Sequence, residues 1–72
     1  MKIGFIGGGA MAEALVSGLL SQKAAAPENI FVSDHKQQRC NDLQAEYHIK
    51  AMVGAESFAD QVDVLFLAIK PQ

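Results

Sequence analysis

The sequence lacks a second cysteine, any tryptophan, a long hydrophobic run and a marked excess of one charge. Because Cys40 is the only cysteine, no disulfide can form within the chain, and no cluster of cysteine and histidine has the spacing of metal ligands. An oxidising compartment is therefore not indicated, and we expect a cytoplasmic protein without a metal site. Six lysines and arginines against eight acidic residues give a net charge of −2 and no basic patch of the kind that binds nucleic acid.

Membrane segments are absent as well. No run approaches the roughly 20 apolar residues of a membrane span. The apolar start of the chain is interrupted by Glu13, and no small-residue cleavage site follows, which argues against a secretory signal. We expect neither a membrane nor a nucleic acid as a partner.

Apolar residues suffice for one small core, since half of the 72 residues are hydrophobic. Domains of about 70 residues bury only about 60% of the surface that their unfolded chains expose, so such a core is marginal without a partner or more chain. One small domain, or part of one, is the upper limit.

Short apolar runs alternate with amphipathic segments along the chain. A bulky apolar run at residues 3–6 stops at glycine, as a buried strand does. Apolar residues then recur at helical spacing, and we expect a helix at residues 10–22 that packs Met11, Leu15 and Leu19 against a sheet. The same reasoning predicts strands at residues 30–34, 48–52 and 64–69 and helices at residues 36–47 and 57–61, the last of them capped by Ser57.

The resulting order is β-α-β-α-β-α-β, which predicts an α/β fold with a parallel sheet and right-handed crossovers. Residues 64–69, VLFLAI, form the continuous apolar run typical of a parallel strand covered on both faces. If the strands lie in the order third, second, first, fourth, this strand is at an edge, where its unpaired backbone groups favour aggregation. We therefore expect a further strand beside it, and we expect the chain to be the front part of a longer protein, a partial domain.

Three consecutive glycines separate the first expected strand from the first helix. The pattern Gly7-x-Gly9-x-x-Ala12 follows a strand and opens a helix within a β-α-β unit, which is the context of the dinucleotide-binding fingerprint of Rossmann-like sheets. Gly7 allows the tight turn, Gly9 lets the backbone approach a pyrophosphate, and Ala12 lets the helix pack closely on the strand. The N–H groups of Ala10 and Met11, at the positive end of the helix dipole, would meet the phosphates. A plain structural turn is the alternative interpretation.

Two signals conflict at the end of the second strand. Asp34 stands where an acidic residue accepts hydrogen bonds from the adenosine ribose of NAD. Around it lie Ser33, Lys36 and Arg39, and a hydroxyl with two cations suits the 2′-phosphate of NADP. We expect NADP(H) to be preferred, with NAD(H) as the alternative cofactor.

Other residues near this end have structural interpretations. Asp34-x-x-Gln37 resembles a capping box, so Asp34 would cap the second helix instead of binding a ribose. We expect His35 in a solvent-exposed loop, Glu13 to interact with the helix dipole, and Cys40 to be a small core residue.

Lys70 and Pro71 follow the fourth expected strand directly, beside the crevice where doubly wound sheets bind ligands. Pro71 stiffens the loop and favours an extended conformation at Lys70. Backbone groups there would contact the nicotinamide half of the cofactor. The alternative is a loop lysine in solvent.

FIGGGAMAEALVSGLL resembles the N-terminal cofactor loop and first helix of Δ1-pyrroline-5-carboxylate reductases, the last enzymes of proline synthesis. DVLFLAIKPQ resembles their fourth strand and the lysine–proline loop after it. The resemblance covers the whole chain and is specific at both ends. It implies that residues 1–72 are the N-terminal part of an NAD(P)-binding Rossmann domain of an enzyme that reduces a cyclic imine, 1-pyrroline-5-carboxylate, to L-proline with hydride from NADPH or NADH.

The resemblance also assigns roles by position. It assigns the pyrophosphate to Ile6, Gly7, Gly8, Gly9, Ala10 and Met11. It assigns the adenosine end to Ser33 with its neighbours, and the nicotinamide side to Ala68, Ile69, Lys70 and Pro71.

Two departures from the family accompany these assignments. Many members carry an asparagine in the loop after the third strand that helps to hold the adenosine, whereas Ala55 and Glu56 stand in that loop here. The family's helical C-terminal domain, which forms the homo-oligomer and binds the substrate, has no counterpart in these residues. We therefore expect the 72-residue chain alone to bind cofactor weakly and not to reduce the imine.

Two kinds of rival remain. The first is another oxidoreductase with the same N-terminal module, such as a β-hydroxyacid dehydrogenase or a coenzyme F420-dependent NADP reductase. The residues AIKPQ disfavour a β-hydroxyacid dehydrogenase. A stand-alone dinucleotide-binding module without chemistry is the other. Continuation of the reading frame into a helical substrate domain would favour the reductase.

Overall fold

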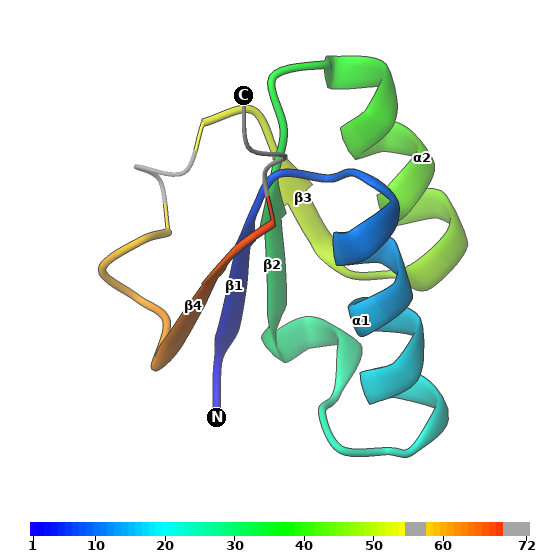
Figure 1. Cartoon of the computed structure of the whole chain (residues 1–72), viewed down its shortest axis with the longest axis vertical. Coiled ribbons are helices and arrows are strands. Elements are labelled where there is room, and N and C mark those ends of the chain that lie inside the picture. Colours follow the sequence, from blue (N-terminus) through cyan, green and yellow to red (C-terminus); the bar gives the residue numbers. More distant parts are fainter. Residues whose placement is uncertain (55–57, 69–72) are drawn as a thin grey trace.

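The computed structural model describes residues 1–54 and 58–68. Its elements alternate along the chain as the sequence predicts, except between the last two strands (Figure 1). They are β1 (Ile3–Ile6), α1 (Ala10–Ser21), a short 3-10 helix η1 (Pro27–Asn29), β2 (Ile30–Ser33), α2 (Gln37–Tyr47), β3 (Lys50–Met52) and β4 (Val64–Leu67).

The strands form one parallel sheet in the order β3-β2-β1-β4. Ile3 of β1 stands between Ile30 of β2 and Val64 of β4, and the register continues in step along all three strands. The α/β fold class and the parallel sheet are confirmed. The strands end together, so the loops that follow them gather at one edge of the sheet.

The expected third helix is not formed in the part of the chain that the structure describes. Phe58 to Gln61 is a turn closed by a hydrogen bond from the N–H of Gln61 to the carbonyl of Phe58, 2.8 Å long. Ser57, the expected cap, lies outside the described residues. The apolar residues of this short segment are too few for a helix with its own buried stripe.

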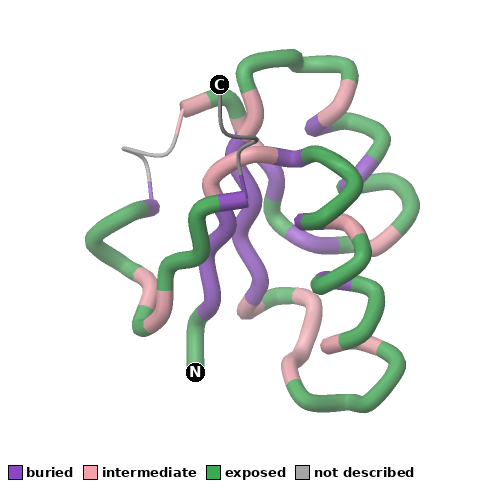
Figure 2. The backbone as a smooth tube through the Cα atoms, viewed as in Figure 1, coloured by how far each residue is buried: buried purple, intermediate pink, exposed green. Residues whose placement is uncertain are grey.

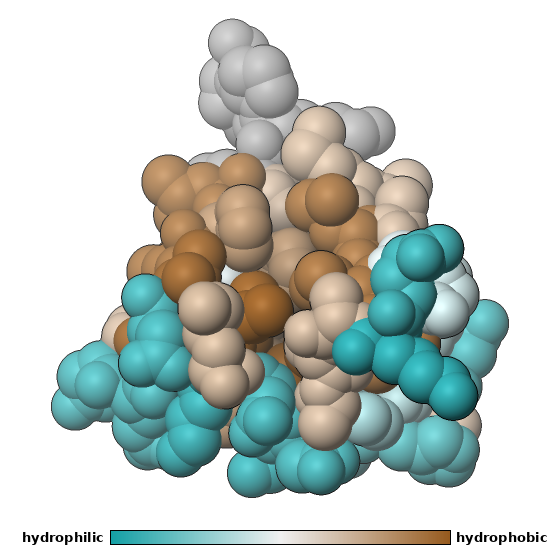
Figure 3. Space-filling view, turned by 90° about the horizontal axis from the view of Figure 1, so that it is seen from below, coloured by the Kyte–Doolittle hydropathy of each residue, from teal (hydrophilic) through white to brown (hydrophobic). Residues whose placement is uncertain are grey.

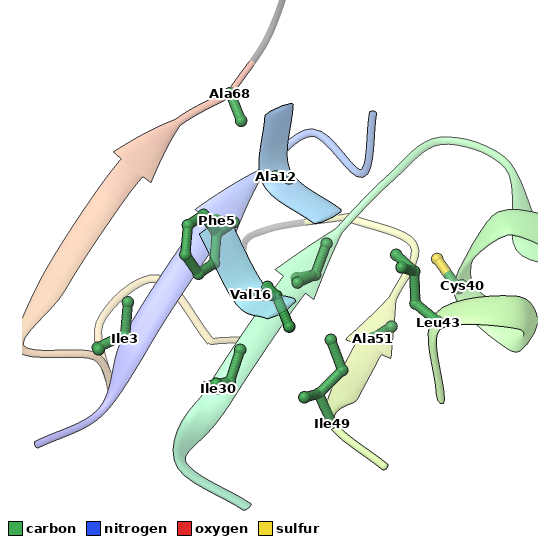
Figure 4. Packing of buried hydrophobic residues seen from close by; sticks show 11 residues of the cluster. Ile3, Phe5, Ala12, Val16, Ile30, Cys40, Leu43, Ile49, Ala51 and Ala68 are labelled. Atoms are coloured by element: carbon green, nitrogen blue, oxygen red, sulfur yellow. The ribbon is translucent and has the colours of Figure 1, made fainter. Parts of the chain in front are cut away.

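Both long helices lie on the same face of the sheet, and the core fills the space between them and the strands (Figures 1 and 4). Alternate strand residues point to this face, because successive side chains of a strand point to opposite sides. Cys40 is fully buried there, as expected for a small core residue. The core residues are Ile3, Phe5, Ala12, Val16, Ile30, Val32, Cys40, Leu43, Ile49, Ala51 and Ala68.

The face of α1 that packs on the sheet is not the expected one. Ala12 and Val16 are buried, whereas Met11 is 65% exposed and Leu15 44% exposed; Leu19 packs at the margin of the core. The small side chain of Ala12 lets the helix approach the strand closely, which centres the buried stripe on Ala12 and Val16. Met11 is thereby left exposed, and Leu15 lies at the margin of the buried stripe, where it lines a hollow together with Phe66 of β4.

On the opposite face of the sheet lies Phe58, in the turn before β4. Phe58 is buried there and stacks on Phe31 with 5.5 Å between ring centroids. Gly4 makes room for it, since a Cβ at Gly4 would lie only 2.9 Å from Cε1 of Phe58. Lys50 also places its ammonium group over the Phe31 ring, 5.0 Å from its centroid.

Strand β4 is at the edge and remains largely exposed (Figure 2). Leu65, Phe66 and Leu67 are 41%, 43% and 68% exposed. The expectation of a strand covered on both faces is therefore wrong for the described residues, because α1 lies over β1 and Phe58 over Phe31, and neither reaches across β4. The part of residues 64–69 beyond Ala68 lies outside the described residues.

A hollow of about 160 Å³ opens between α1 and β4, lined by apolar side chains that include Leu15 and Phe66. Figure 3 shows hydrophobic surface gathered in a continuous area with hydrophilic residues along its border. Within residues 1–54 and 58–68, no helix combines the length and apolar character needed to cross a bilayer.

Candidate functional site

A larger hollow, about 710 Å³ in volume, lies where the carboxyl ends of the strands meet the start of α1. This size falls within the range of small-molecule sites, roughly 300–1,000 Å³. All four strands contribute residues at or just after their ends, and Ala68 is the residue that follows β4. The lining residues are Ile6, Gly7, Gly8, Gly9, Ser33, Asp34, His35, Lys36, Val53, Gly54 and Ala68.

The glycine loop turns sharply at its first residue. Gly7 has φ 104°, a conformation that residues with a side chain rarely adopt, and its N–H donates to the carbonyl of Ser33 over 2.8 Å. This bond continues the pairing of β1 with β2 by one residue. The expected tight turn at Gly7 is therefore present.

Gly9 precedes the first residue of α1, Ala10, and its carbonyl accepts the N–H of Glu13 over 3.0 Å. The first N–H groups of a helix have no partners within the helix and carry its positive dipole end. A Cβ at Gly9 would meet no atom within 4 Å, so the space beside it is open. An anionic group could approach the backbone here without displacing any side chain.

Gly8 is buried, and side chains from the segment after β2 bond to both of its backbone groups. Its N–H donates to Oδ1 of Asp34 over 3.0 Å, and its carbonyl accepts from Nε of Arg39. A Cβ at this position would lie 3.2 Å from Cβ of Asp34 and 3.3 Å from Cδ1 of Leu43. A side chain at the middle position would therefore require Asp34 or Leu43 to shift by a few tenths of an ångström.

Asp34 accepts two backbone hydrogen bonds, since Oδ2 also takes the N–H of Lys36 over 3.0 Å. Burial acts to raise the pKa of this carboxyl, but the N–H groups of Lys36 and Gly8 outweigh it, and the pKa lies below its usual value. The expected capping box is not formed. The N-cap of α2 is Lys36 without a side-chain cap bond, and Gln37 bonds to Asn41 instead.

Arg39 does not line the hollow. Its Nη2 donates to Oε1 of Glu13 over 2.6 Å, and Oε2 of Glu13 accepts the hydroxyl of Tyr47 over 2.7 Å (Glu13 on α1, Arg39 and Tyr47 on α2). Two hydrogen bonds lower the pKa of Glu13, and the one from Tyr47 has a larger effect than the one from Arg39. The hydrogen bond to Glu13 raises the pKa of Tyr47 to about 12. Nε and Nη2 of Arg39 are thus bonded within the chain, and its expected pairing with a 2′-phosphate stays a prediction.

Most of the other expected site residues do meet in the hollow. Ser33, Lys36 and Ala68 line it, together with His35. Ala10 and Met11 are exposed at the start of α1, beside the hollow but not among its lining residues. Ile69, Lys70 and Pro71, and likewise Ala55 and Glu56, lie outside the described residues.

Val53 and Gly54 line the hollow and were not singled out from the sequence. Their position directly after β3 could have indicated them, since the carboxyl ends of parallel strands share one edge of the sheet. No group of three or more His, Cys, Asp or Glu is placed to hold a metal ion within residues 1–54 and 58–68.

Comparison with known proteins gives consistent matches. The family described as "NADP oxidoreductase coenzyme F420-dependent" matches residues 2–72. A pyrroline-5-carboxylate reductase of Synechocystis sp. is 39% identical over 72 residues, covering 100% of this chain and 27% of the relative. One of Methanosarcina acetivorans is 41% identical over 71 residues, covering 99% and 26%.

A solved structure of a pyrroline-5-carboxylate reductase from Coxiella burnetii superposes with a TM-score of 0.90 at 30% identity, covering 97% of this chain and 26% of that one. The chain thus spans about a quarter of the length of the relatives that it matches.

Proposed function

The chain belongs to the family of coenzyme F420-dependent NADP oxidoreductases, and from this premise we propose that it is the N-terminal dinucleotide-binding part of a pyrroline-5-carboxylate reductase. The glycine loop carries this proposal. Gly7 makes the turn, Gly9 leaves open space at the start of α1, and a hollow of about 710 Å³ lies in front of both. Backbone N–H groups at a helix start favour a pyrophosphate. On this proposal the loop from Ile6 to Met11 holds the two phosphates.

We propose NADP(H) as the preferred cofactor, with NAD(H) as the alternative. The family's cofactor and the position of Lys36 and Ser33 in the lining support a 2′-phosphate. Asp34 supports the ribose of NAD, but two N–H groups already stabilise its carboxylate charge, which reduces its repulsion of a phosphate.

The reaction proposed for the whole protein is the reduction of 1-pyrroline-5-carboxylate to L-proline. The reduced nicotinamide supplies the hydride that the imine carbon accepts. We place the nicotinamide near Ala68, Ile69, Lys70 and Pro71, at the end of β4. Orientation of the imine against it requires residues beyond those of this chain.

The remaining parts of the proposal concern the assembled protein. Residues 1–72 would be followed by a helical domain that binds the substrate and forms a homo-oligomer, and we propose a cytoplasmic location. The relatives' greater length supports such a domain.

Titration of the 72-residue chain and of the protein in its natural length with NADPH and with NADH tests this proposal, together with an assay for proline formation. We expect saturable binding, tighter for NADPH, and proline formation only by the natural-length protein. Binding without proline formation at natural length would favour the stand-alone dinucleotide-binding module or another NADP-dependent oxidoreductase. Absence of binding by a folded natural-length protein would overturn the proposal.

Gly9→Val is the sharpest variant for the phosphate loop. A side chain at Gly9 meets no atom in the ligand-free fold, and φ −78° with ψ −169° is an ordinary extended conformation. The valine would occupy the space in which we propose that a phosphate binds. We therefore expect nucleotide binding to be lost while the melting temperature stays that of the unaltered protein. Gly18→Ala, which also enters open space but on the far part of α1, is the matched control and should bind normally.

A further inference from the structure

Gly8 is the most tightly fixed residue of the phosphate loop. The β2–α2 segment bonds to its N–H through Asp34 and to its carbonyl through Arg39. The two flanking glycines have explanations of their own, in the turn at Gly7 and the open space at Gly9. The middle of the loop is therefore set by side chains that come from 26 and 31 positions further along the chain.

Arg39 is in turn fixed by a second layer of contacts. Its Nη2 lies 2.6 Å from Oε1 of Glu13, in the first turn of α1, and Oε2 of Glu13 lies 2.7 Å from the hydroxyl of Tyr47, in the last residue of α2. The Arg39 and Glu13 side chains are each only 31% exposed. The three side chains thus tie both helices to the loop between β1 and α1.

We propose that Arg39, held by Glu13 and Tyr47, is a positioning residue for the phosphate loop and not a ligand of the cofactor's 2′-phosphate. The inference rests on the proposed function, namely that this loop binds a dinucleotide. The cation left for the adenosine end is then Lys36, which lines the hollow, whereas Arg39 does not.

Two physical arguments support these different roles of Arg39 and Lys36. Nε and Nη2 of Arg39 donate to the Gly8 carbonyl and the Glu13 carboxylate, so turning these two groups toward a 2′-phosphate would break both contacts. An ionised Glu13 in the first turn of α1 would also repel a phosphate bound at the same helix end. Pairing with Arg39 offsets this charge, so the network both shapes the loop and removes an unfavourable field from it.

The decisive experiment compares Arg39→Met with Lys36→Met in the natural-length protein, using equilibrium titration with NADPH and with NADH. We expect Arg39→Met to weaken both cofactors by the same factor, about tenfold, since a loop that binds the shared pyrophosphate is disturbed. Lys36→Met should weaken NADPH by about tenfold and leave NADH unchanged, because only NADPH carries the 2′-phosphate. Loss of NADPH affinity alone in Arg39→Met would overturn the inference.

Two further variants cover the case in which Arg39→Met fails to fold. Arg39→Lys keeps the cation beside Glu13 but cannot span both acceptors, so it should weaken both cofactors equally and less than methionine does. Tyr47→Phe removes a single hydroxyl and should weaken both by about two- to threefold. Unchanged affinity for both cofactors in Arg39→Lys would contradict the positioning role.

The Gly8 amide gives a readout that needs no cofactor. We expect its hydrogen exchange, followed by NMR in the ligand-free protein, to become faster in Arg39→Lys and Arg39→Met and to stay unchanged in Lys36→Met. If the unaltered protein binds neither cofactor, the proposed function fails while this readout still decides whether Arg39 fixes the loop. Unchanged Gly8 exchange in both arginine variants would overturn the inference.

Discussion

The two strands that flank β1 have similar sequences and opposite surroundings. β2, IFVS, is buried at all its residues, whereas β4, VLFL, is exposed at three of four (Figure 2). Both pair with β1 in the same parallel register. The difference lies in what covers them, because the core of α1, α2 and the first three strands includes Ile30 and Val32 of β2 and Phe58 stacks on Phe31 of β2, whereas no residue of β4 itself belongs to that core. An apolar run therefore predicts a strand, but its burial depends on neighbours far along the chain.

The difference extends to the loops that follow the strands. After β2, Asp34 and Arg39 bond to the middle glycine of the glycine loop, and their own charges are paired or hydrogen-bonded. Beside β4, the stacked rings of Phe5 and Phe66, 5.3 Å apart, border a hollow with only apolar lining. In the first region the charged side chains have partners within the fold, whereas in the second large apolar side chains of β4 are left exposed.

The largest expected effect compares the same truncation in the two strands. Ile30→Ala in β2 removes a fully buried side chain and should lower the free energy of unfolding by about 2–5 kcal/mol. Leu65→Ala in β4, where the side chain is 41% exposed, should cost about 1 kcal/mol. Urea unfolding of both variants measures the difference. A cost at Leu65 as large as that at Ile30 would show that β4 is covered in the protein tested.

The second prediction concerns the close approach at the end of β2. Gly8→Ala brings a methyl group within 3.4 Å of Asp34 and Leu43 and should destabilise by about 1–3 kcal/mol. Gly18→Ala, in an open position of α1, should stabilise by about 0.5–1 kcal/mol because alanine favours the helix. Thermal melts of both variants test this, and equal effects would refute the tight packing around Gly8.

The third prediction uses pH to separate the region after β2, with its paired charges, from the apolar region beside β4. Because contacts with Tyr47 and Arg39 lower the pKa of Glu13 below its ordinary value of 4.5, their stabilisation is present above that value and is lost as the pH falls through the lowered pKa. Asp34 adds to the loss in the same direction. The melting temperature should therefore fall below about pH 4.5, and less steeply in Glu13→Gln. A profile unchanged by Glu13→Gln would contradict it.

The smallest effect on stability is expected at the exposed end of β4. Leu67→Lys replaces a side chain that is 68% exposed and should change the free energy of unfolding by no more than about 0.5 kcal/mol. A lysine on an edge strand hinders pairing with a second chain, so self-association measured by light scattering should decrease. Increased scattering, or a large loss of stability, would show that Leu67 contacts something in the folded protein.

The sequence predicted what depends on local patterns. The strands, the two long helices, the turn at Gly7 and the burial of Cys40 follow from periodicity and backbone sterics. The partners of Arg39 could not be predicted in the same way, because Glu13 lies on another helix and the pairing depends on how α1 and α2 pack. The position of Arg39 shortly after a strand end predicted a ligand contact, and this stays a prediction; its contacts with Gly8 and Glu13 were not predicted.

The exposed face of α1 and the role of Gly8 were missed for a related reason. Met11 and Leu15 are apolar at helical spacing, but the small Ala12 decides which stripe approaches the sheet. Three glycines in a row predicted a loop that binds phosphate. The sequence pattern did not distinguish Gly7, which makes the turn, from Gly8, which packs against Asp34 and Leu43. Only the three-dimensional neighbours of each position separate these requirements.

The hydrogen bond from Tyr47 to Glu13 has a practical consequence. The 72-residue sequence contains one tyrosine and no tryptophan. The change in aromatic ultraviolet absorption at alkaline pH therefore reports the ionisation of Tyr47 alone. With the pKa of Tyr47 raised to about 12, the ionisation of this ring is an intrinsic optical signal of whether the link between the two helices is intact. Spectrophotometric titration can thus follow the contact between α1 and α2 beside the glycine loop without a label, a cofactor or an assay.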